Sequence, residues 1–154
     1  MIEENPLPIV ELRDVDKRYG DGPLILDKIT FSAKRGDFIT LIGPSGCGKS
    51  TILKLISGLN PISSGRIVVD GLEPRNAVEK LAFVFQEPTL LPWRTVAQNV
   101  EVPLRLHGSD PKLRDEVVGK SLALVGLADR KDYYPRQLSG GQKMRVSIAL
   151  DLRV

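Results

Sequence analysis

A glycine-rich loop that ends in a lysine and a hydroxyl spans Gly43-Pro44-Ser45-Gly46-Cys47-Gly48-Lys49-Ser50. It matches the pattern G-x-x-x-x-G-K-[ST] at every position. Glycines leave the backbone free to curl around a phosphate and to aim its N–H groups inward. Lys49 can reach the β- and γ-phosphates of a nucleotide, and the Ser50 hydroxyl can take one coordination site of Mg²⁺. The loop therefore predicts a nucleoside triphosphate and Mg²⁺ as ligands.

Cys47 and Thr51, within and just after the loop, say less about its function than the glycines, Lys49 and Ser50 do. Cys47 fits better as a small filler of the loop than as a catalytic thiol, because no second His or carboxylate motif accompanies it. Thr51 is the next residue of the helix that follows the loop, and it is the last of the candidate phosphate-binding residues there. The alternative interpretation is a chance glycine loop ahead of a helix. A single Cys and a single His, His107, predict neither an intrachain disulfide nor a metal cluster, so a reducing cytoplasm is the natural compartment.

A second candidate site is the segment Leu138-Ser139-Gly140-Gly141-Gln142. Ser139 and Gln142 have the spacing of a capping box, and the two glycines between them leave the first amides of a helix sterically open. Such a helix N-terminus can bind a further phosphate. On local grounds a plain capped helix is the alternative.

The elements that must position these residues begin with strands. Five short runs predict them: Ile9–Val15, Ile29–Ala33, Phe38–Ile42, Ile67–Val69 and Leu81–Phe85. The third run suits a buried parallel strand that leads into the glycine loop. Apolar residues at helical spacing then predict a helix over Ser50–Ser57 with Gly58 as its stop, namely Ile52, Leu55, Ile56 and Leu59.

The chain becomes mostly helical from about Pro88 onward. Val96, Val100 and Leu104 lie one turn apart, and Asp110-Pro111 predicts a helix start. One face of that later helix is expected to carry Leu113, Val117, Leu122 and Val125, ahead of Gly126. We expect one domain over residues 1–154, with a β-rich part at about 1–87 and a helical part at about 88–154.

Charge and hydropathy exclude several classes of protein. The net charge is +3, and the basic residues are scattered rather than interleaved with aromatics, so nucleic acid is not an expected partner. The longest apolar stretches are too short to cross a bilayer. The N-terminus has neither the basic start nor the apolar core of a secretory signal. Any membrane association is therefore expected to come through a partner.

Three motifs, in their order and spacing, resemble the ATP-binding cassette of ABC transporters. The loop Gly43–Ser50 resembles Walker A, Gln86 at an expected strand end resembles the Q-loop, and Leu138–Gln142 resembles the LSGGQ signature. The similarity covers Ile9 to Ala149. It implies an α/β fold of the P-loop NTPase type, present in part, with ATP and Mg²⁺ as cofactors. A GTPase interpretation leaves Leu138–Gln142 unexplained and lacks an Asn-Lys-x-Asp segment.

The resemblance also implies roles. Tyr19 matches the aromatic that stacks on adenine, although a half-buried strand-end tyrosine is the alternative. Gln86 matches the glutamine that contacts Mg²⁺ and the attacking water, so Lys49 and Gln86 are the candidate catalytic residues, and an ordinary polar strand end is the alternative for Gln86. Ser139, Gly140, Gly141 and Gln142 match the signature that faces the ATP held by Lys49 of an opposing subunit.

The resemblance implies an ATP hydrolase on the cytoplasmic face of the inner membrane, bound peripherally to permease subunits and paired with a second ATP-binding subunit. The stretch from Gln86 to Val96 resembles importers of nitrate, sulfonates and taurine. Trp93 within it either marks that subgroup or fills a core position. The transported solute is not encoded here.

The family's Walker B strand, D-loop and switch histidine would lie beyond Val154. From this we expect weak nucleotide binding, negligible hydrolysis by this chain alone and a sheet with an exposed apolar flank. His107 precedes the signature and is expected at the surface. Two alternatives to a transporter subunit stay open: a truncated nucleotide-binding remnant without catalysis, and a soluble ABC ATPase outside transport.

Overall fold

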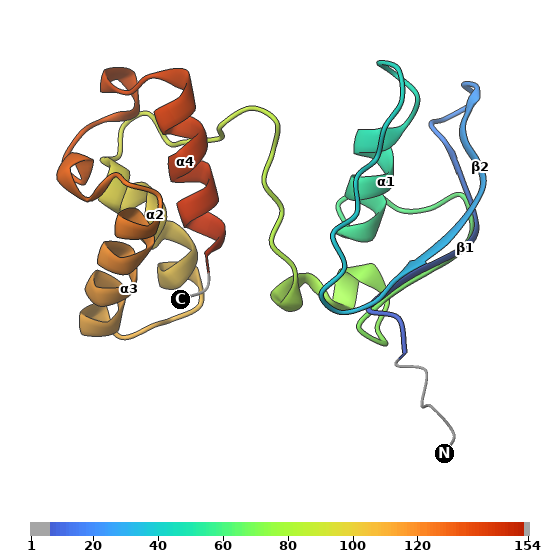
Figure 1. Cartoon of the computed structure of the whole chain (residues 1–154), viewed down its shortest axis with the longest axis horizontal. Coiled ribbons are helices and arrows are strands. Elements are labelled where there is room, and N and C mark those ends of the chain that lie inside the picture. The colour runs from blue at the N-terminus through green and yellow to red at the C-terminus, as the bar shows by residue number, and fades with distance from the viewer. Residues whose placement is uncertain (1–6, 153–154) are drawn as a thin grey trace. The chain divides into compact units, whose positions relative to one another are not determined.

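The computed structural model describes residues 7–152 and divides the chain into two compact units, Met1–Leu81 and Ala82–Val154 (Figure 1). The first unit holds a three-stranded sheet and one α-helix, and the second holds three α-helices. This confirms the expected α/β class, with an antiparallel β segment first and helices later. Four short 3-10 helices complete the regular structure of the described residues: Pro74–Asn76, Val78–Lys80, Ala128–Arg130 and Pro135–Gln137.

The sheet of the first unit is antiparallel throughout. β1 (Val10–Arg18) is its central strand, with β2 (Leu24–Ala33) and β3 (Ser64–Val69) on either side. Leu12 pairs with Phe31 of β2 and with Ile67 of β3, which places apolar side chains from all three strands together. The strands predicted from the first, second and fourth apolar runs are therefore confirmed, with longer bounds.

Asp16 ties the three strands together where the pairing register shifts. Its carboxylate accepts a hydrogen bond from the backbone N–H of Lys28 at 2.7 Å and another from the hydroxyl of Ser64 at 2.7 Å. The Lys28 N–H, and after it the Ser64 hydroxyl, stabilise the ionised carboxylate and hold the pKa of Asp16 below its ordinary value. One side chain of β1 thus secures both neighbouring strands.

This arrangement predicts a pH dependence of stability. A lowered pKa stabilises the fold above the unfolded pKa of about 3.9, and this contribution is lost as the pH falls through the folded pKa. We expect Asp16→Asn to be less stable than the wild type at pH 7 and to lose less free energy of unfolding below about pH 4, as measured by urea denaturation. Asp27→Asn, an exposed position on β2, controls for the loss of a negative charge. Parallel pH curves for Asp16→Asn and the wild type would contradict this role.

A single helix packs on the sheet of the first unit. α1 (Lys49–Ile56) contributes Leu55 to a core that contains Leu12, Val15, Leu26, Leu55, Ile67, Val69 and Ala77. Gly58 follows the C-cap residue with a φ of +72°, a conformation that favours glycine, so the predicted helix stop is confirmed. Leu59, predicted on the same face, lies beyond the helix and is 52% exposed.

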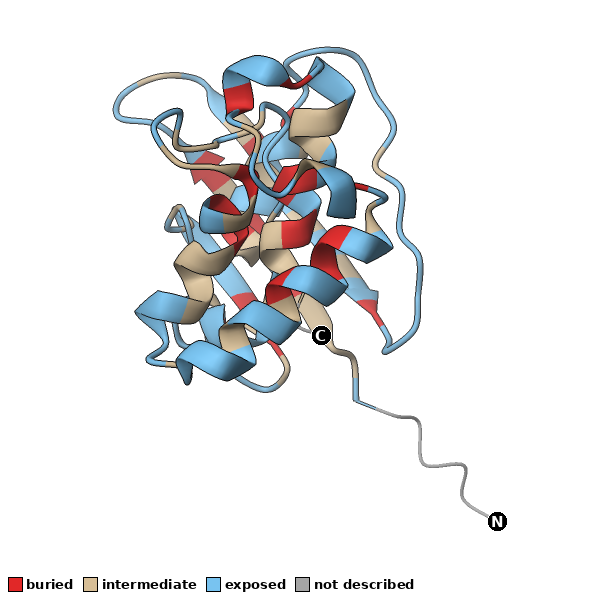
Figure 2. Ribbon diagram, turned by 90° about the vertical axis from the view of Figure 1, so that its left-hand side faces the viewer, coloured by how far each residue is buried: buried red, intermediate tan, exposed pale blue. Residues whose placement is uncertain are grey.

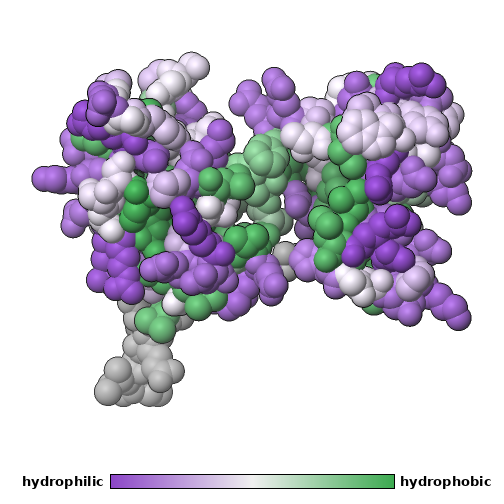
Figure 3. All heavy atoms as spheres, turned by 180° about the vertical axis from the view of Figure 1, so that it is seen from behind, coloured by the Kyte–Doolittle hydropathy of each residue, from purple (hydrophilic) through white to green (hydrophobic). Residues whose placement is uncertain are grey.

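Two predicted strands are wrong. Phe38–Ile42 and Leu81–Phe85 have no regular secondary structure, and Phe38 and Ile42 are 94% and 91% exposed. A strand exists only through hydrogen bonds to a neighbour, and in the described part of the chain no strand pairs with either segment. Apolar residues consequently reach the surface of both units (Figure 3).

The second unit is a three-helix body. α2 (Val96–Leu106), α3 (Pro111–Leu124) and α4 (Gly140–Asp151) bury one side each and expose the other (Figure 2). Asp110 caps α3 by accepting from the N–H of Lys112 at 2.8 Å, which confirms the predicted start at Asp110-Pro111. The core of this unit consists of Val96, Val100, Val118, Leu122, Leu127, Leu138, Val146 and Ala149.

The inner face of α3 agrees with the prediction at Leu122, which is buried, and at Val125, which packs against the core, but not at Leu113. Leu113, predicted to face the core, is 53% exposed, whereas Val118 is 7% exposed. The buried stripe runs back from Leu122 in steps of four residues through Val118 to Arg114, whose guanidinium pairs with Glu101 of α2 at 3.5 Å. Leu113 lies beside that stripe rather than on it.

Asn99 of α2 holds the turn that precedes the helix. Its Nδ2 donates to the carbonyl oxygens of Leu91, Arg94 and Thr95 at 3.2, 3.1 and 2.9 Å, and its Oδ1 accepts from the N–H of Leu91 at 2.7 Å. Asn99 itself is 2% exposed. Trp93 lies in this clamped turn and is 71% exposed, so its interpretation as a core residue is wrong.

The start of α2 is also joined to a distant part of the second unit. The N–H groups of Val96 and Ala97 donate to the carbonyl oxygens of Tyr133 and Lys131 at 2.8 and 2.9 Å. These bonds satisfy amides that a helix N-terminus otherwise leaves free. Among the described residues, none of the helices combines the length and the hydropathy that a bilayer crossing needs.

Candidate phosphate-binding site

The glycine loop runs directly into α1. Gly48 is the N-cap of this helix, and Gly46 and Gly48 have φ values of +81° and +98°, which side-chain-bearing residues rarely adopt. The cap has no side-chain hydrogen bond, and the first turn carries no acidic residue. Because no side-chain acceptor occupies this N-terminus, its amides are open to an anion.

Gly48 is also required by packing. A Cβ at this position would lie 2.6 Å from Cδ2 of Leu26, a buried core residue of β2, and 3.4 Å from the carbonyl oxygen of Ile25. The loop therefore approaches the sheet more closely than a side chain allows. In contrast, a Cβ at Gly46 would have nothing within 4 Å. The two glycines with positive φ thus serve different purposes.

This contrast gives a matched pair of variants. Gly46→Ala and Gly48→Ala each force alanine into a left-handed conformation, at a cost of about 1–3 kcal/mol. We expect Gly48→Ala to lower the free energy of unfolding further, because its Cβ also displaces Leu26. Urea denaturation of the two variants measures the difference. Equal losses would show that the contact with Leu26 is relieved without cost.

Lys49 lies over the loop rather than away from it. Its Nζ donates to the carbonyl oxygens of Gly43 and Pro44 at 2.8 and 2.6 Å and approaches Sγ of Cys47 at 3.5 Å. The ammonium is thereby held at the loop without an anionic partner among the described residues. If a phosphate were bound, the ammonium of Lys49 would exchange its neutral carbonyl partners for a charged phosphate oxygen, which forms the stronger hydrogen bond.

The two hydroxyls that follow Lys49 differ in exposure. Ser50 is exposed in the first turn of α1, and Thr51 is half-buried. A hydroxyl oxygen suits the hard cation Mg²⁺, which keeps waters and phosphate oxygens as its other ligands. Within residues 7–152, no group of three or more His, Cys, Asp or Glu side chains is arranged to hold a metal ion. The exposed hydroxyl of Ser50 fits one ligand position of a magnesium ion.

Tyr19 follows β1 in the same unit and is 46% exposed. Its hydroxyl accepts a hydrogen bond from Nδ2 of Asn60 at 2.8 Å, and the ammonium of Lys17 lies 4.6 Å from the centre of its ring. Sequence reasoning singled out Tyr19 and missed Asn60 and Lys17. No local signal connects Asn60 to a tyrosine 41 residues earlier.

The other predicted site residues belong to the second unit. Gln86 is exposed in a segment without regular structure, close to its predicted place but not at a strand end. Ser139 is the N-cap of α4 and forms the predicted capping box: its Oγ accepts from the N–H of Gln142 at 3.3 Å, and Oε1 of Gln142 accepts from the N–H of Ser139 at 2.9 Å. A Cβ at Gly140 or Gly141 would have nothing within 4 Å, so this helix start is open.

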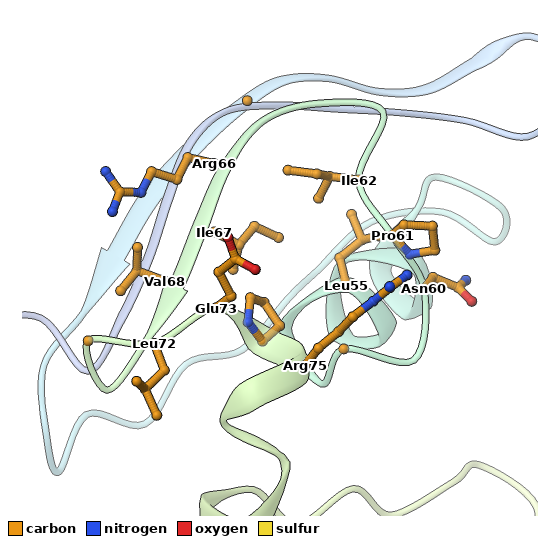
Figure 4. A pocket seen from close by; sticks show the side chains of 14 residues that line it. Leu55, Asn60, Pro61, Ile62, Arg66, Ile67, Val68, Leu72, Glu73 and Arg75 are labelled. Atoms are coloured by element: carbon orange, nitrogen blue, oxygen red, sulfur yellow. The ribbon is translucent and has the colours of Figure 1, made fainter.

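A hollow of about 640 Å³ lies elsewhere in the first unit (Figure 4). Leu55 of α1 and Ile67 of β3 supply apolar walls, and Arg66, Glu73 and Arg75 supply charged ones. Its size is that of a small-molecule pocket. However, none of the predicted site residues lines it. The hollow is thus separate from the glycine loop.

A protein-family model described as ABC transporter matches residues 26–152. The chain belongs to this family. The match spans both the glycine loop and the capped start of α4, and it confirms the resemblance drawn from those two motifs.

Individual relatives give the same result. The chain is 44% identical over 140 residues to an aliphatic sulfonates import ATP-binding protein of Mesorhizobium japonicum, covering 89% of this chain and 50% of the relative. It is 40% identical over 146 residues to an uncharacterised ABC transporter ATP-binding protein of Methanocaldococcus jannaschii, covering 95% and 55%. The chain thus spans about half the length of the curated relatives it matches.

Solved structures of ATP-binding cassettes confirm the fold. A dimeric cassette in a post-hydrolysis state, bound to ADP and inorganic phosphate, matches with a TM-score of 0.83 at 32% identity, covering 93% of this chain and 68% of that one. The protein cbiO1 of Clostridium perfringens, part of the ABC transporter complex cbiONQ, matches with a TM-score of 0.81 at 32% identity, covering 94% of this chain and 61% of that one. The partial P-loop NTPase fold predicted from the sequence is therefore confirmed.

Proposed function

We propose that this chain is the ATP-binding part of an ABC importer and that it couples nucleotide binding and hydrolysis to solute uptake. The observation that carries the proposal is the uncapped start of α1, where Lys49 holds its ammonium over the loop Gly43–Ser50. Relatives named as import proteins for sulfonates, spermidine or putrescine, and methionine support the transport role. The motifs and the family argue against a soluble ABC ATPase outside transport.

In this proposal the phosphates lie in the glycine loop. The backbone N–H groups of the loop Gly43–Ser50, all except Pro44, which has none, bind the phosphate oxygens together with Thr51. Lys49 neutralises charge on the β- and γ-phosphates. Ser50 would offer its hydroxyl oxygen to Mg²⁺, which when bound would offset the negative charge of the phosphate oxygens. Gln86 is proposed as a residue that would contact Mg²⁺ and the attacking water, so Lys49 and Gln86 are the candidate catalytic residues.

The adenine and the second subunit complete the proposed site. Tyr19 stacks on adenine through its exposed ring. The sterically open N-terminus of α4, with Ser139, Gly140, Gly141 and Gln142, faces the γ-phosphate of ATP bound to a second ATP-binding subunit. The dimeric state of a solved neighbour supports the pairing of two subunits. Losing that phosphate removes charge-assisted bonds between the subunits, which turns hydrolysis into opening. Permease subunits receive the motion and hold the protein peripherally at the inner membrane.

Calorimetric titration tests the phosphate site directly. Mg·ATP is expected to bind, and AMP, which lacks the β- and γ-phosphates, is expected to bind at least about tenfold more weakly, because each charge-assisted hydrogen bond contributes about 1.5–3 kcal/mol. Equal affinities for the two nucleotides would exclude the glycine loop as the site. For the transport role, the protein is expected to sediment with membranes and to be released by high salt.

A further inference from the structure

Tyr19 is held from three directions in the first unit. Its backbone begins a turn in which the N–H of Gly22 donates to the carbonyl oxygen of Tyr19 at 3.0 Å. Its hydroxyl accepts from Nδ2 of Asn60 at 2.8 Å. One face of its ring carries the ammonium of Lys17, 4.6 Å from the ring centre. The backbone, the hydroxyl and one ring face of Tyr19 are thus all engaged, although the residue is 46% exposed.

Lys17 is itself unusual. It is 6% exposed, and its Nζ donates to the carbonyl oxygen of Pro61 at 2.7 Å. A buried ammonium without a carboxylate partner is costly, and its contacts here are that carbonyl and the π face of Tyr19. Lys17 thus covers one face of the ring and joins it to the residue after Asn60.

Asn60 connects this arrangement to the phosphate-loop helix. Its backbone N–H donates to the carbonyl oxygen of Lys54, in the last turn of α1, at 3.1 Å. Figure 4 labels Asn60 and Pro61 beside the C-terminal end of that helix. The glycine loop lies at the start of α1 and the anchor of Tyr19 at its end, so one rigid element positions both.

We infer that Asn60 and Lys17 are positioning residues that fix Tyr19 as a one-sided platform for the base of a purine nucleotide. The inference rests on the proposed function, because it takes Tyr19 to be the residue that stacks on adenine. A stacking side chain that is already ordered loses less rotamer entropy when the base arrives. The ammonium on one ring face directs the base to the other.

The test compares ATP with inorganic tripolyphosphate, which occupies the phosphate loop but has no base. Calorimetry on the wild type, Asn60→Ala, Tyr19→Phe and the double variant measures both ligands. Each single variant is expected to weaken ATP binding by about two- to tenfold and to leave tripolyphosphate binding unchanged. The double variant is expected to match the single ones, because both substitutions remove the same hydrogen bond. Asn76→Ala, an exposed asparagine of the same unit, is the control.

Three results would overturn the inference. If Asn60→Ala weakened ATP and tripolyphosphate equally, Asn60 would only support α1. If Asn60→Ala and Tyr19→Phe left ATP binding unchanged while Tyr19→Ala weakened it, the platform would need no anchor, and the positioning role alone would fail. If Tyr19→Ala also had no effect on ATP binding, the proposed stacking role of Tyr19 would fail together with the inference.

Lys17→Met, which keeps the length of the side chain, is expected to behave like Asn60→Ala.

Discussion

Lys49→Ala is expected to weaken ATP binding by about 100-fold, since it removes the charge that, in the proposed function, reaches the β- and γ-phosphates. The ammonium already lies at the loop, where its partners are the carbonyl oxygens of Gly43 and Pro44. Calorimetric titration with Mg·ATP measures the loss. Removing the two carbonyl contacts should change the free energy of unfolding by only about 1 kcal/mol, because hydrogen bonds at exposed sites contribute little.

The chain offers a matched control for this substitution. Lys54 is an exposed lysine in the last turn of the same helix, away from the loop. Lys54→Ala removes the same charge from α1 and is expected to retain wild-type affinity. Comparable weakening by both variants would mean that net charge, rather than the position of Lys49, governs binding. Unchanged affinity in Lys49→Ala would remove the basis of the proposed function.

Gly140→Asp has the second large expected effect, and it concerns association rather than binding. In the proposed dimer a carboxylate at this position would face the γ-phosphate of the opposing ATP and repel it. We expect ATP-dependent association, followed by size-exclusion chromatography with Mg·ATP, to be lost, while the affinity of the monomer for ATP is retained. The fold should tolerate the change, because nothing lies within 4 Å of a Cβ at Gly140. An acidic residue in the first turn also suits the helix dipole.

Gly119→Asp is the corresponding control in the second unit. Gly119 is an exposed glycine of α3, also with nothing within 4 Å of a Cβ. It should associate like the wild type. If Gly140→Asp associated normally with ATP, the sandwich arrangement would not hold for this protein.

Local sequence signals predicted the helices well. Ser139 with Gln142, Asp110 with Pro111, and Gly58 each act through hydrogen bonds or backbone conformation within a few residues, so the sequence contains all the information needed. Gly48, which the loop pattern placed where the backbone must curl, has a positive φ in the structure. Gly48, Ser139 and Gln142 also belong to the candidate site, which is why the family could be recognised from its motifs.

Pairing and packing across the chain were predicted less well. Phe38–Ile42 has the composition of a buried strand, but composition does not say which strand pairs with it. The exposure of Trp93 depends on the clamp by Asn99, and the anchor of Tyr19 depends on Asn60. Such contacts join residues that are distant in sequence, or bury a polar side chain that hydrogen-bonds to backbone groups. The hydrophobic periodicity of the sequence contains no information about either kind of contact.

The bonds from Val96 and Ala97 to Tyr133 and Lys131 make a mechanical linkage inside the second unit. Asn99 joins the turn that carries Trp93 to α2 by hydrogen bonds. The start of α2 is in turn hydrogen-bonded to the segment that leads to the cap of α4. The turn that carries Trp93, the start of α2 and the segment that leads to the cap of α4 are therefore joined by hydrogen bonds within one unit.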